Sequence, residues 1–369
     1  MPRWGHSGTW LRMTQRSPCY SRKVFAGNSR AANTTGRRHR FIVPDTDGPV
    51  TGGTLFNRQL LRALVELGED ACTVGNEPRD VTLNAPEPTR FWVDSLCIDE
   101  LLRLCESSPA RHRVGLIVHY LPSLLKHAHP TRMTLSSQER SALDAAHCLL
   151  VTSNYMAGLV DTLTPSQCPI VVVEPGRVAS GRASLQSSAA ALRATLIANL
   201  LPNKGVLPFL RELSACVQPA DDFVLSIVGS KEVAPGYARE CEKVCGASEP
   251  LGQRVQLLGA ASPEQAVEWL SHSRVLISAS VSESYGMALA EARTLGIAVL
   301  ALPGGNIANL VHARAGGEIV SSHAALASSF LQLCRTPAEL DRRVILAQLH
   351  ALAPRTWAQA ASDYLRQLI

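Results

Sequence analysis

The sequence lacks long hydrophobic runs and the signals that mark secreted or membrane proteins. No stretch approaches the roughly 20 apolar residues that a membrane-spanning helix needs, and the N-terminal part has no apolar centre of a secretory signal. The ten cysteines form no Cys-x-x-Cys pair, so we expect reduced, mostly buried thiols rather than disulfides or metal ligands. These absences predict a soluble protein of the cytoplasm.

Acidic residues are missing from the first 40 positions. Nine of the 36 Lys and Arg residues lie there, with none of the 31 Asp and Glu residues, so the rest of the chain is close to neutral. That distribution argues against a nucleic-acid partner, which requires a basic face on the folded body. An Arg- and Ser-rich, acid-free segment is also typical of organelle transit peptides. The simpler interpretation is a disordered basic extension over residues 1–39, or a start codon chosen too far upstream.

The remaining chain alternates short apolar runs with helical patterns, which is typical of an α/β fold with parallel sheets. In the first part, strands are predicted at 41–45, 71–74, 91–94, 114–119, 148–152 and 170–174, and helices at 54–67, 136–146 and 154–163. Residues 177–191 are small and polar without a period, which predicts a linker.

The alternation restarts more clearly after the linker. Strands are predicted at 194–199, 223–228, 254–258, 274–279 and 297–301. Helices are predicted at 205–217, 236–247, 263–271, 284–295, 305–313, 322–335, 337–352 and 356–368. Two α/β halves joined by a linker predict a cleft between them, where ligands usually bind.

The most informative stretch is SESYGMALAEARTLG, residues 282–296. Glu283 follows a predicted strand, so it should project from the carboxyl edge of the sheet. Glu291 lies two helical turns later, within about 80° of the same face, among apolar neighbours. A carboxylate there needs hydrogen-bond donors, which the vicinal hydroxyls of a ribose would supply. Judged by spacing alone, two solvated glutamates are the simpler explanation.

Three further motifs lie at the ends of predicted strands. In IANLLPNKG (197–205), Lys204 and Gly205 open a helix whose N-terminus suits a diphosphate. In PDTDGPVTGG (44–53), the last two glycines allow backbone amides to approach a ligand. The loop is not Gly-x-Gly-x-x-Gly, so a dinucleotide-dependent oxidoreductase lacks its fingerprint. VHYLP (118–122) places His119 at a strand end, where a half-buried structural histidine is the commoner outcome.

Together with LPGGN (302–306), these motifs resemble family 4 (group 1) of the retaining GT-B glycosyltransferases. The resemblance covers about 40–369 and is densest between 194 and 320. It implies an α/β GT-B fold, in which two Rossmann-like parallel-sheet domains face each other across a cleft and the C-terminal helix crosses back to the first domain. The implied divisions are an acceptor domain at 40–176, a linker at 177–191, a donor domain at 192–355 and a C-terminal helix at 356–369.

The resemblance also implies the site residues. His119, Glu283 and Lys204 are implied to be catalytic. The implied donor-binding residues are Gly52, Gly53, Asn199, Lys204, Gly205, Glu283, Tyr285, Gly286, Met287, Glu291, Gly304 and Gly305. Asn199 stands where the family usually has an arginine, so the usual two-cation grip on the donor diphosphate loses one cation.

The leading hypothesis is therefore transfer of a sugar from a nucleotide-diphosphate sugar, with retention of anomeric configuration implied by the family. We expect no cofactor and no metal, because the Asp45/Asp47 pair lies in the first loop rather than at a later strand end. The acceptor, a small molecule, lipid or glycan, is not readable, and a peripheral membrane contact and the oligomeric state are left open. Two alternatives are a catalytically weak nucleotide-sugar-binding protein, motivated by Asn199, and a nucleotide-sugar epimerase on the same fold.

Overall fold

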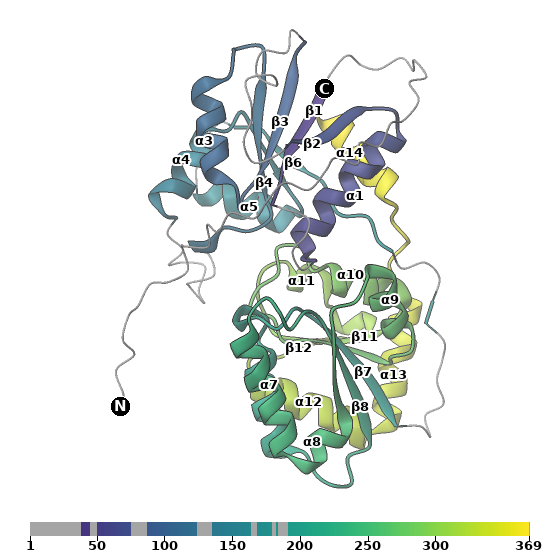
Figure 1. Cartoon of the computed structure of the whole chain (residues 1–369). Coiled ribbons are helices and arrows are strands. Elements are labelled where there is room, and N and C mark those ends of the chain that lie inside the picture. The colour runs from purple at the N-terminus through teal and green to yellow at the C-terminus, as the bar shows by residue number, and fades with distance from the viewer. Residues whose placement is uncertain are drawn as a thin grey trace. The chain divides into compact units, whose positions relative to one another are not determined.

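The computed structural model describes residues 38–44, 50–74, 87–123, 135–163, 168–178, 182–183 and 191–368. These residues form two six-stranded sheets, both entirely parallel, with helices around each (Figure 1). The predicted α/β class with two Rossmann-like sheets is confirmed. Most of the predicted basic extension and the Asp45/Asp47 pair lie outside the described residues. Among the described residues, no helix is both long and apolar enough to cross a membrane.

The first sheet has the strand order β2-β1-β3-β4-β5-β6. Its strands are β1 (Arg38–Ile42), β2 (Asp70–Val74), β3 (Thr89–Asp94), β4 (Arg113–Val118), β5 (Cys148–Val151) and β6 (Ile170–Val172). Its helices are α1 (Gly52–Glu66), α3 (Ile98–Ser107), α4 (Ser137–Ala145) and α5 (Asn154–Leu163). β3 and β4 are almost continuously buried, as expected of parallel strands covered on both faces.

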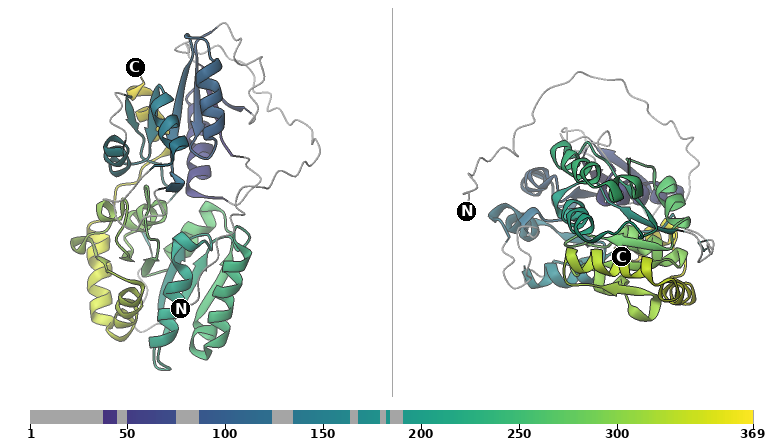
Figure 2. Two further views of the ribbon diagram at one scale, coloured as in Figure 1. Left: turned by 90° about the vertical axis from the view of Figure 1, so that its left-hand side faces the viewer. Right: turned by 90° about the horizontal axis from the view of Figure 1, so that it is seen from below.

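Two apolar clusters cover the two faces of this sheet. One joins the strands to α3, α4 and α5, and the other joins them to α1 and to α14 (Trp357–Gln367). Tyr364 of α14 is fully buried there, and its hydroxyl lies 2.7 Å from Nδ1 of His39. The last helix therefore returns to the first sheet beside α1, as predicted (Figures 1 and 2).

The second sheet has the order β12-β11-β10-β7-β8-β9. Its strands are β7 (Leu192–Ile197), β8 (Phe223–Val228), β9 (Val255–Gly259), β10 (Val275–Ser278), β11 (Ala298–Ala301) and β12 (Gly317–Ile319). Its helices are α6 (Val206–Cys216), α7 (Pro235–Ala247), α8 (Glu249–Arg254), α9 (Pro263–Ser271), α10 (Met287–Leu295), α11 (Ile307–Leu310), α12 (His323–Arg335) and α13 (Pro337–Leu349). Two short 3-10 turns, η3 (Pro202–Lys204) and η4 (Ala313–Ala315), complete it.

The strand order reverses once in each sheet, and both reversals lie at the first strand. β1 is flanked by β2 and β3, and β7 is flanked by β8 and β10. In open parallel sheets, ligands bind beyond the carboxyl ends of the strands at such a reversal. The topology therefore indicates the loops after β1, β3, β7 and β10 as the places to look for a site.

Several predicted boundaries differ from the observed ones. β1 begins at Arg38 rather than 41, because His39 is buried while the flanking arginines keep contact with solvent and Arg40 pairs with Asp70 at 2.9 Å. The helix predicted at 284–295 begins only at Met287, because Gly286 has a φ of 90°. Helices α3 and α8 and strand β12 were not predicted. The domain divisions remain a prediction, and most of the predicted linker lies outside the described residues.

Candidate functional site

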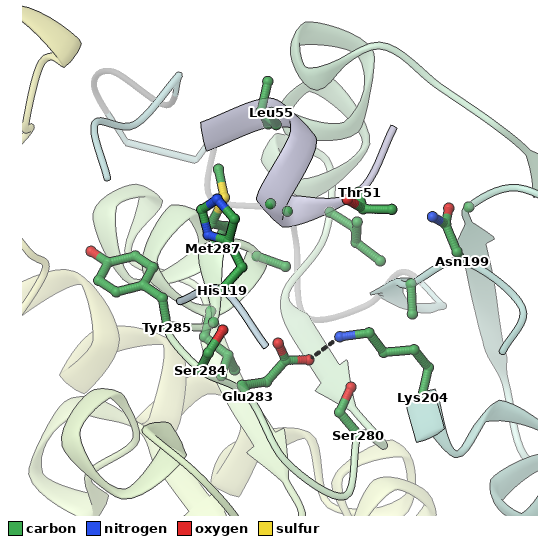
Figure 3. A pocket seen from close by; sticks show the side chains of 18 of the residues that line it. Thr51, Leu55, His119, Asn199, Lys204, Ser280, Glu283, Ser284, Tyr285 and Met287 are labelled. Carbon is green, nitrogen blue, oxygen red and sulfur yellow. Dashed lines mark hydrogen bonds and ion pairs between the residues drawn. The ribbon is translucent and has the colours of Figure 1, made fainter. Parts of the chain in front are cut away.

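A cavity of about 660 Å³ lies where loops at the carboxyl ends of both sheets meet. The first turn of α1 and the residues after β3, β4 and β5 line it on one side, and the residues after β7, β8, β9 and β10 line it on the other. Nine of the predicted site residues are among those that line it: Gly52, Gly53, His119, Asn199, Lys204, Glu283, Tyr285, Gly286 and Met287. The structure therefore brings together residues that are far apart in the sequence (Figure 3).

An ion pair lies at the reversal point of the second sheet. Nζ of Lys204, which follows β7, donates to Oε1 of Glu283, which follows β10, at 2.6 Å. The two side chains are only partly exposed, at 26% and 20%. Lys204 is the one lysine or arginine among the described residues that line the cavity. The pair therefore supplies a cation and a carboxylate at the place where the topology predicts a ligand.

The Gly304–Gly305 loop supports the backbone of Glu283. A Cβ at Gly305 would lie 2.1 Å from the carbonyl oxygen of Glu283, and Gly305 has a φ of 61°. The amide of Asn306 donates to the same oxygen at 2.7 Å. A Cβ at Gly304 would lie 2.0 Å from the carbonyl oxygen of Val281. The two glycines therefore permit a close approach of two backbones, and this positions the Glu283 carboxylate.

Gly205 has a similar packing role. Its φ of 65° is left-handed, and a Cβ there would lie 2.0 Å from the carbonyl oxygen of Ala279. Its amide donates to the carbonyl of Pro202 at 3.1 Å, which closes the turn that carries Lys204. Gly205, Gly304 and Gly305 do not line the cavity. Their predicted contacts with a donor stay predictions.

Glu291 also lies apart from the cavity lining. Its side chain is 8% exposed, and Oε1 accepts a hydrogen bond from the amide of Val178 at 2.7 Å. The carboxylate thus has a backbone donor from the start of the predicted linker, which satisfies part of the requirement for donors at a buried acid. The predicted contact with a ribose stays a prediction.

Tyr285, Gly286 and Met287 form the turn into α10 and line the cavity. Tyr285 is 5% exposed, its hydroxyl accepts from Arg177 at 3.4 Å, and its carbonyl accepts from Asn306 at 2.8 Å. Burial raises the pKa of the Tyr285 phenol above its ordinary value, so this side chain stays neutral at physiological pH. It packs and positions the turn rather than supplying charge.

Asn199 connects three segments of the cavity wall. Its Nδ2 donates to the carbonyl oxygen of Val50 at 3.0 Å, and its Oδ1 accepts from the amide of Ser230 at 2.9 Å. The loop before α1 is thereby joined to the loops after β7 and β8, and Figure 3 shows the Asn199 side chain at the cavity. The residue that replaces the expected arginine supplies hydrogen bonds within the protein and no positive charge.

His119 lines the same cavity as Glu283 and Lys204, from the first sheet (Figure 3). It follows β4, is 8% exposed, and stacks edge-on against Phe56 with 5.1 Å between ring centroids. A Cβ at Gly53 would lie 3.1 Å from Cδ2 of the imidazole, so the glycine lets the first turn of α1 approach the ring. Burial lowers the pKa of His119, and the nearby Asp94 carboxylate opposes this shift in part. The imidazole is therefore neutral at physiological pH.

Two residues behind His119 were not predicted from the sequence. Oδ1 of Asn57 lies 2.7 Å from Nε2 of His119, and Nδ2 of Asn57 donates to Oδ2 of Asp94 at 2.6 Å. Both residues are almost completely buried. The available signals were an asparagine on the apolar face of a helix and an aspartate at the carboxyl end of the FWVD strand.

Comparisons with known proteins support the resemblance. Residues 192–336 match the family model described as Glycosyl transferases group 1. The resemblance to this family is confirmed over that segment, which contains Lys204, Glu283 and the Gly304–Gly305 loop. No curated protein sequence matches the chain.

Solved structures show that the fold is GT-B. Sucrose-phosphate synthase from Thermosynechococcus elongatus is similar with a TM-score of 0.72 at 16% identity, over 90% of this chain and 99% of that one. The Anabaena protein HepE in complex with UDP has a TM-score of 0.66 at 14% identity, over 90% and 99%. A glycosyltransferase from Rickettsia africae ESF-5 has a TM-score of 0.60 at 14% identity, over 89% and 97%. The fold is therefore that of the GT-B glycosyltransferases, and the match to the group 1 family lies in the second sheet and its helices.

Proposed function

We propose that this protein transfers a sugar from a nucleotide-diphosphate sugar to a hydroxyl of an acceptor, with retention of anomeric configuration and without a metal ion. The observation that carries the proposal is the Lys204–Glu283 pair, 2.6 Å apart, in a cavity at the strand-order reversal of the second sheet. This pair lies within the segment that matches the group 1 glycosyltransferases. We place the activity in the cytoplasm.

Charge separation in the reaction explains why a cation is needed. When the bond between the anomeric carbon and the diphosphate breaks, positive charge develops on the sugar and negative charge on the leaving group. Lys204 would bind the diphosphate and stabilise its developing charge, and the N-terminus of α1 at Gly52 and Gly53 would add favourable backbone dipoles. A cavity that holds both reactants also limits access of water, whose attack would hydrolyse the donor.

The carboxylate and the imidazole would orient the sugar. Glu283 accepts hydrogen bonds only, so it suits the hydroxyls of a sugar and disfavours a phosphate. His119 lines the same cavity from the other sheet and would contact the transferred sugar or the acceptor. Donor binding would then open the ion pair, because Lys204 would exchange the carboxylate for phosphate oxygens while Glu283 turns to the hydroxyls.

A second candidate is a nucleotide-sugar-binding protein with weak turnover. Asn199 favours it, because both ends of its amide are engaged with Val50 and Ser230 and the cavity gains no second cation from this position. Such a protein would bind a donor with little release of nucleoside diphosphate. An epimerase on this fold would instead convert the donor sugar without any acceptor.

A two-part experiment tests the proposal. A panel of nucleotide-diphosphate sugars is screened for thermal stabilisation, because a ligand raises apparent stability by RT ln(1 + [L]/Kd). Each stabilising donor is then incubated with sugar, lipid and glycan acceptors, and released nucleoside diphosphate and glycosylated product are measured by mass spectrometry. The proposal expects product that depends on acceptor. Stabilisation without turnover would favour the binding protein, and an altered donor sugar without acceptor would favour the epimerase.

Two variants make the result specific to the cavity. Lys204→Ala should abolish transfer. Lys243→Ala removes the same charge from an exposed position on α7 and should behave as wild type. Equal activity in wild type and Lys204→Ala would contradict the assignment of the cation.

A further inference from the structure

His119 and two buried polar side chains behind it, Asn57 and Asp94, form a continuous series of hydrogen bonds. The Asp94 carboxylate lies at one end, where Oδ1 accepts from the amide of Leu96 at 2.9 Å and Oδ2 accepts from Nδ2 of Asn57 at 2.6 Å. Oδ1 of Asn57 lies 2.7 Å from Nε2 of His119. Asp94, Asn57 and His119 are 1%, 3% and 8% exposed. Water therefore has little opportunity to replace any of these bonds.

The chemistry of the three groups determines which one donates and which one accepts in each hydrogen bond. A carboxylate only accepts hydrogen bonds, so Asn57 must present its NH₂ group to Asp94. Its carbonyl oxygen then faces His119, and a carbonyl oxygen also only accepts. Nε2 of His119 must therefore carry a proton. In a neutral imidazole this leaves Nδ1 without one, as a hydrogen-bond acceptor.

The packing places Nδ1 on the edge of the ring away from α1. Cδ2 and Nε2 form one edge of the imidazole, and this edge faces α1: Asn57 contacts Nε2, and a Cβ built at Gly53 lies 3.1 Å from Cδ2. Nδ1 and Cε1 form the opposite edge. His119 lines the cavity, so its remaining lone pair is available on the cavity side of the ring.

We propose that Asn57 and Asp94 are positioning residues that hold His119 as the Nε2–H tautomer, so that Nδ1 accepts a hydrogen bond from a hydroxyl in the cavity. A hydroxyl can donate to this lone pair, whereas a phosphate or carboxylate oxygen would be repelled by it. His119 thus selects a hydroxyl-bearing part of a ligand, while Lys204 on the facing wall attracts the anionic part. That the hydroxyl belongs to a sugar or its acceptor rests on the proposed function; the tautomer does not.

The tautomer can be measured without any substrate. The full chain is labelled with ring-¹⁵N histidine, and the two ring nitrogens are identified at pH 8 from their shifts and long-range couplings to ring protons. Among the eleven histidines, His119 is assigned by its loss in His119→Gln. We expect a protonated Nε2 and an unprotonated Nδ1. A proton on Nδ1 in the wild-type protein would overturn the inference, and this result needs no variant.

Variants then test which residues hold the tautomer. Asn57→Leu removes the acceptor and should let the Nδ1–H form appear, with kcat lowered roughly tenfold by the loss of one positioned hydrogen bond. Asn57→Asp keeps an oxygen beside Nε2 and should keep the Nε2–H form. Asp94→Asn should allow the Asn57 amide to turn over and present its NH₂ group to His119, which would move the proton to Nδ1.

If Asn57 has only a structural role, a different result is expected. Leu60→Ala is the matched control, because Leu60 is buried on the same helix but does not line the cavity. It should lower Tm without moving the proton. If Asn57→Leu likewise lowers Tm and leaves the tautomer as in wild type, Asn57 only packs the core and the inference fails. If the tautomer responds as expected but no donor is turned over, the proposed function fails and the positioning role stands.

Discussion

The two walls of the cavity differ in the kind of side chain that they present to a ligand. The wall from the second sheet presents charge, through Lys204 and Glu283, 2.6 Å apart and partly exposed to solvent. The wall from the first sheet presents a neutral imidazole, supported by a chain of buried hydrogen bonds through Asn57 and Asp94. One wall is therefore suited to bind an anion, and the other is suited to orient hydroxyls. Substitutions in the two walls should therefore have different effects on donor turnover, stability and nucleotide binding.

The largest effect is expected at the charged wall. Lys204→Ala removes the lysine that lines the cavity, and we expect kcat/KM for donor turnover to fall by about 10²–10³-fold, as for loss of one electrostatic contact to a leaving group. Steady-state release of nucleoside diphosphate measures this. Lys243→Ala should stay within twofold of wild type. A fall of less than tenfold in Lys204→Ala would show that this wall does not depend on the cation.

The next effect tests how the charged wall is built. Gly305→Ala would place a Cβ 2.1 Å from the carbonyl of Glu283 at a left-handed φ of 61°, so the free energy of unfolding should fall by about 1–3 kcal/mol and the Glu283 carboxylate should shift. Denaturant titration and donor turnover should both decline. The control is Gly246→Ala on α7, where a Cβ meets no atom within 4 Å; it should be neutral or stabilising. Equal stability of the two variants would contradict the packing argument.

The neutral wall should respond to acid. Burial lowers the pKa of His119 from 6.5 in the folded protein, so the unfolded chain takes up its proton first as the pH falls. The His119 contribution to stability is therefore full above about pH 6.5 and is lost as the pH falls below it, by at most about 1.4 kcal/mol per pH unit. Denaturant titrations between pH 7.5 and 5 measure the slope. His119→Gln should have a shallower slope, and an unchanged slope would contradict a neutral, buried imidazole.

The smallest effect concerns the missing cation. Asn199→Arg would add a second positive charge to the charged wall, and we expect nucleoside diphosphate to bind up to about fivefold more tightly, as for a solvent-accessible ion pair. Isothermal titration calorimetry measures the change. Weaker binding would show that the hydrogen bonds of Asn199 to Val50 and Ser230 matter more than added charge.

The charged wall was more predictable from sequence than the neutral wall, for a physical reason. Lys204 and Glu283 each follow an apolar strand within a local motif, so the chain itself brings them to the sheet edge. Asn57 and Asp94 are 37 positions apart and meet only because α1 packs beside the end of β3. A polar residue on an apolar helix face was the one available sign, and it does not identify its partner.

Local sequence patterns gave a wrong or incomplete prediction where contacts with other segments decide the burial or the partner of a residue. His39 is buried between two arginines of β1. Because these three residues are polar, the apolar pattern used to predict the strand began only at Phe41. Glu291 was predicted to need hydrogen-bond donors, and one donor is the backbone of Val178. No periodicity in the helix itself could have identified a backbone amide from a distant segment.

A structure of the protein with a nucleotide-diphosphate sugar bound would show directly what Lys204, Glu283 and His119 contact. We predict that Nζ of Lys204 leaves Oε1 of Glu283 and lies within hydrogen-bond distance of a diphosphate oxygen, while the carboxylate accepts from sugar hydroxyls and Nδ1 of His119 faces a hydroxyl. A bound donor whose diphosphate lies away from an intact Lys204–Glu283 pair would contradict it.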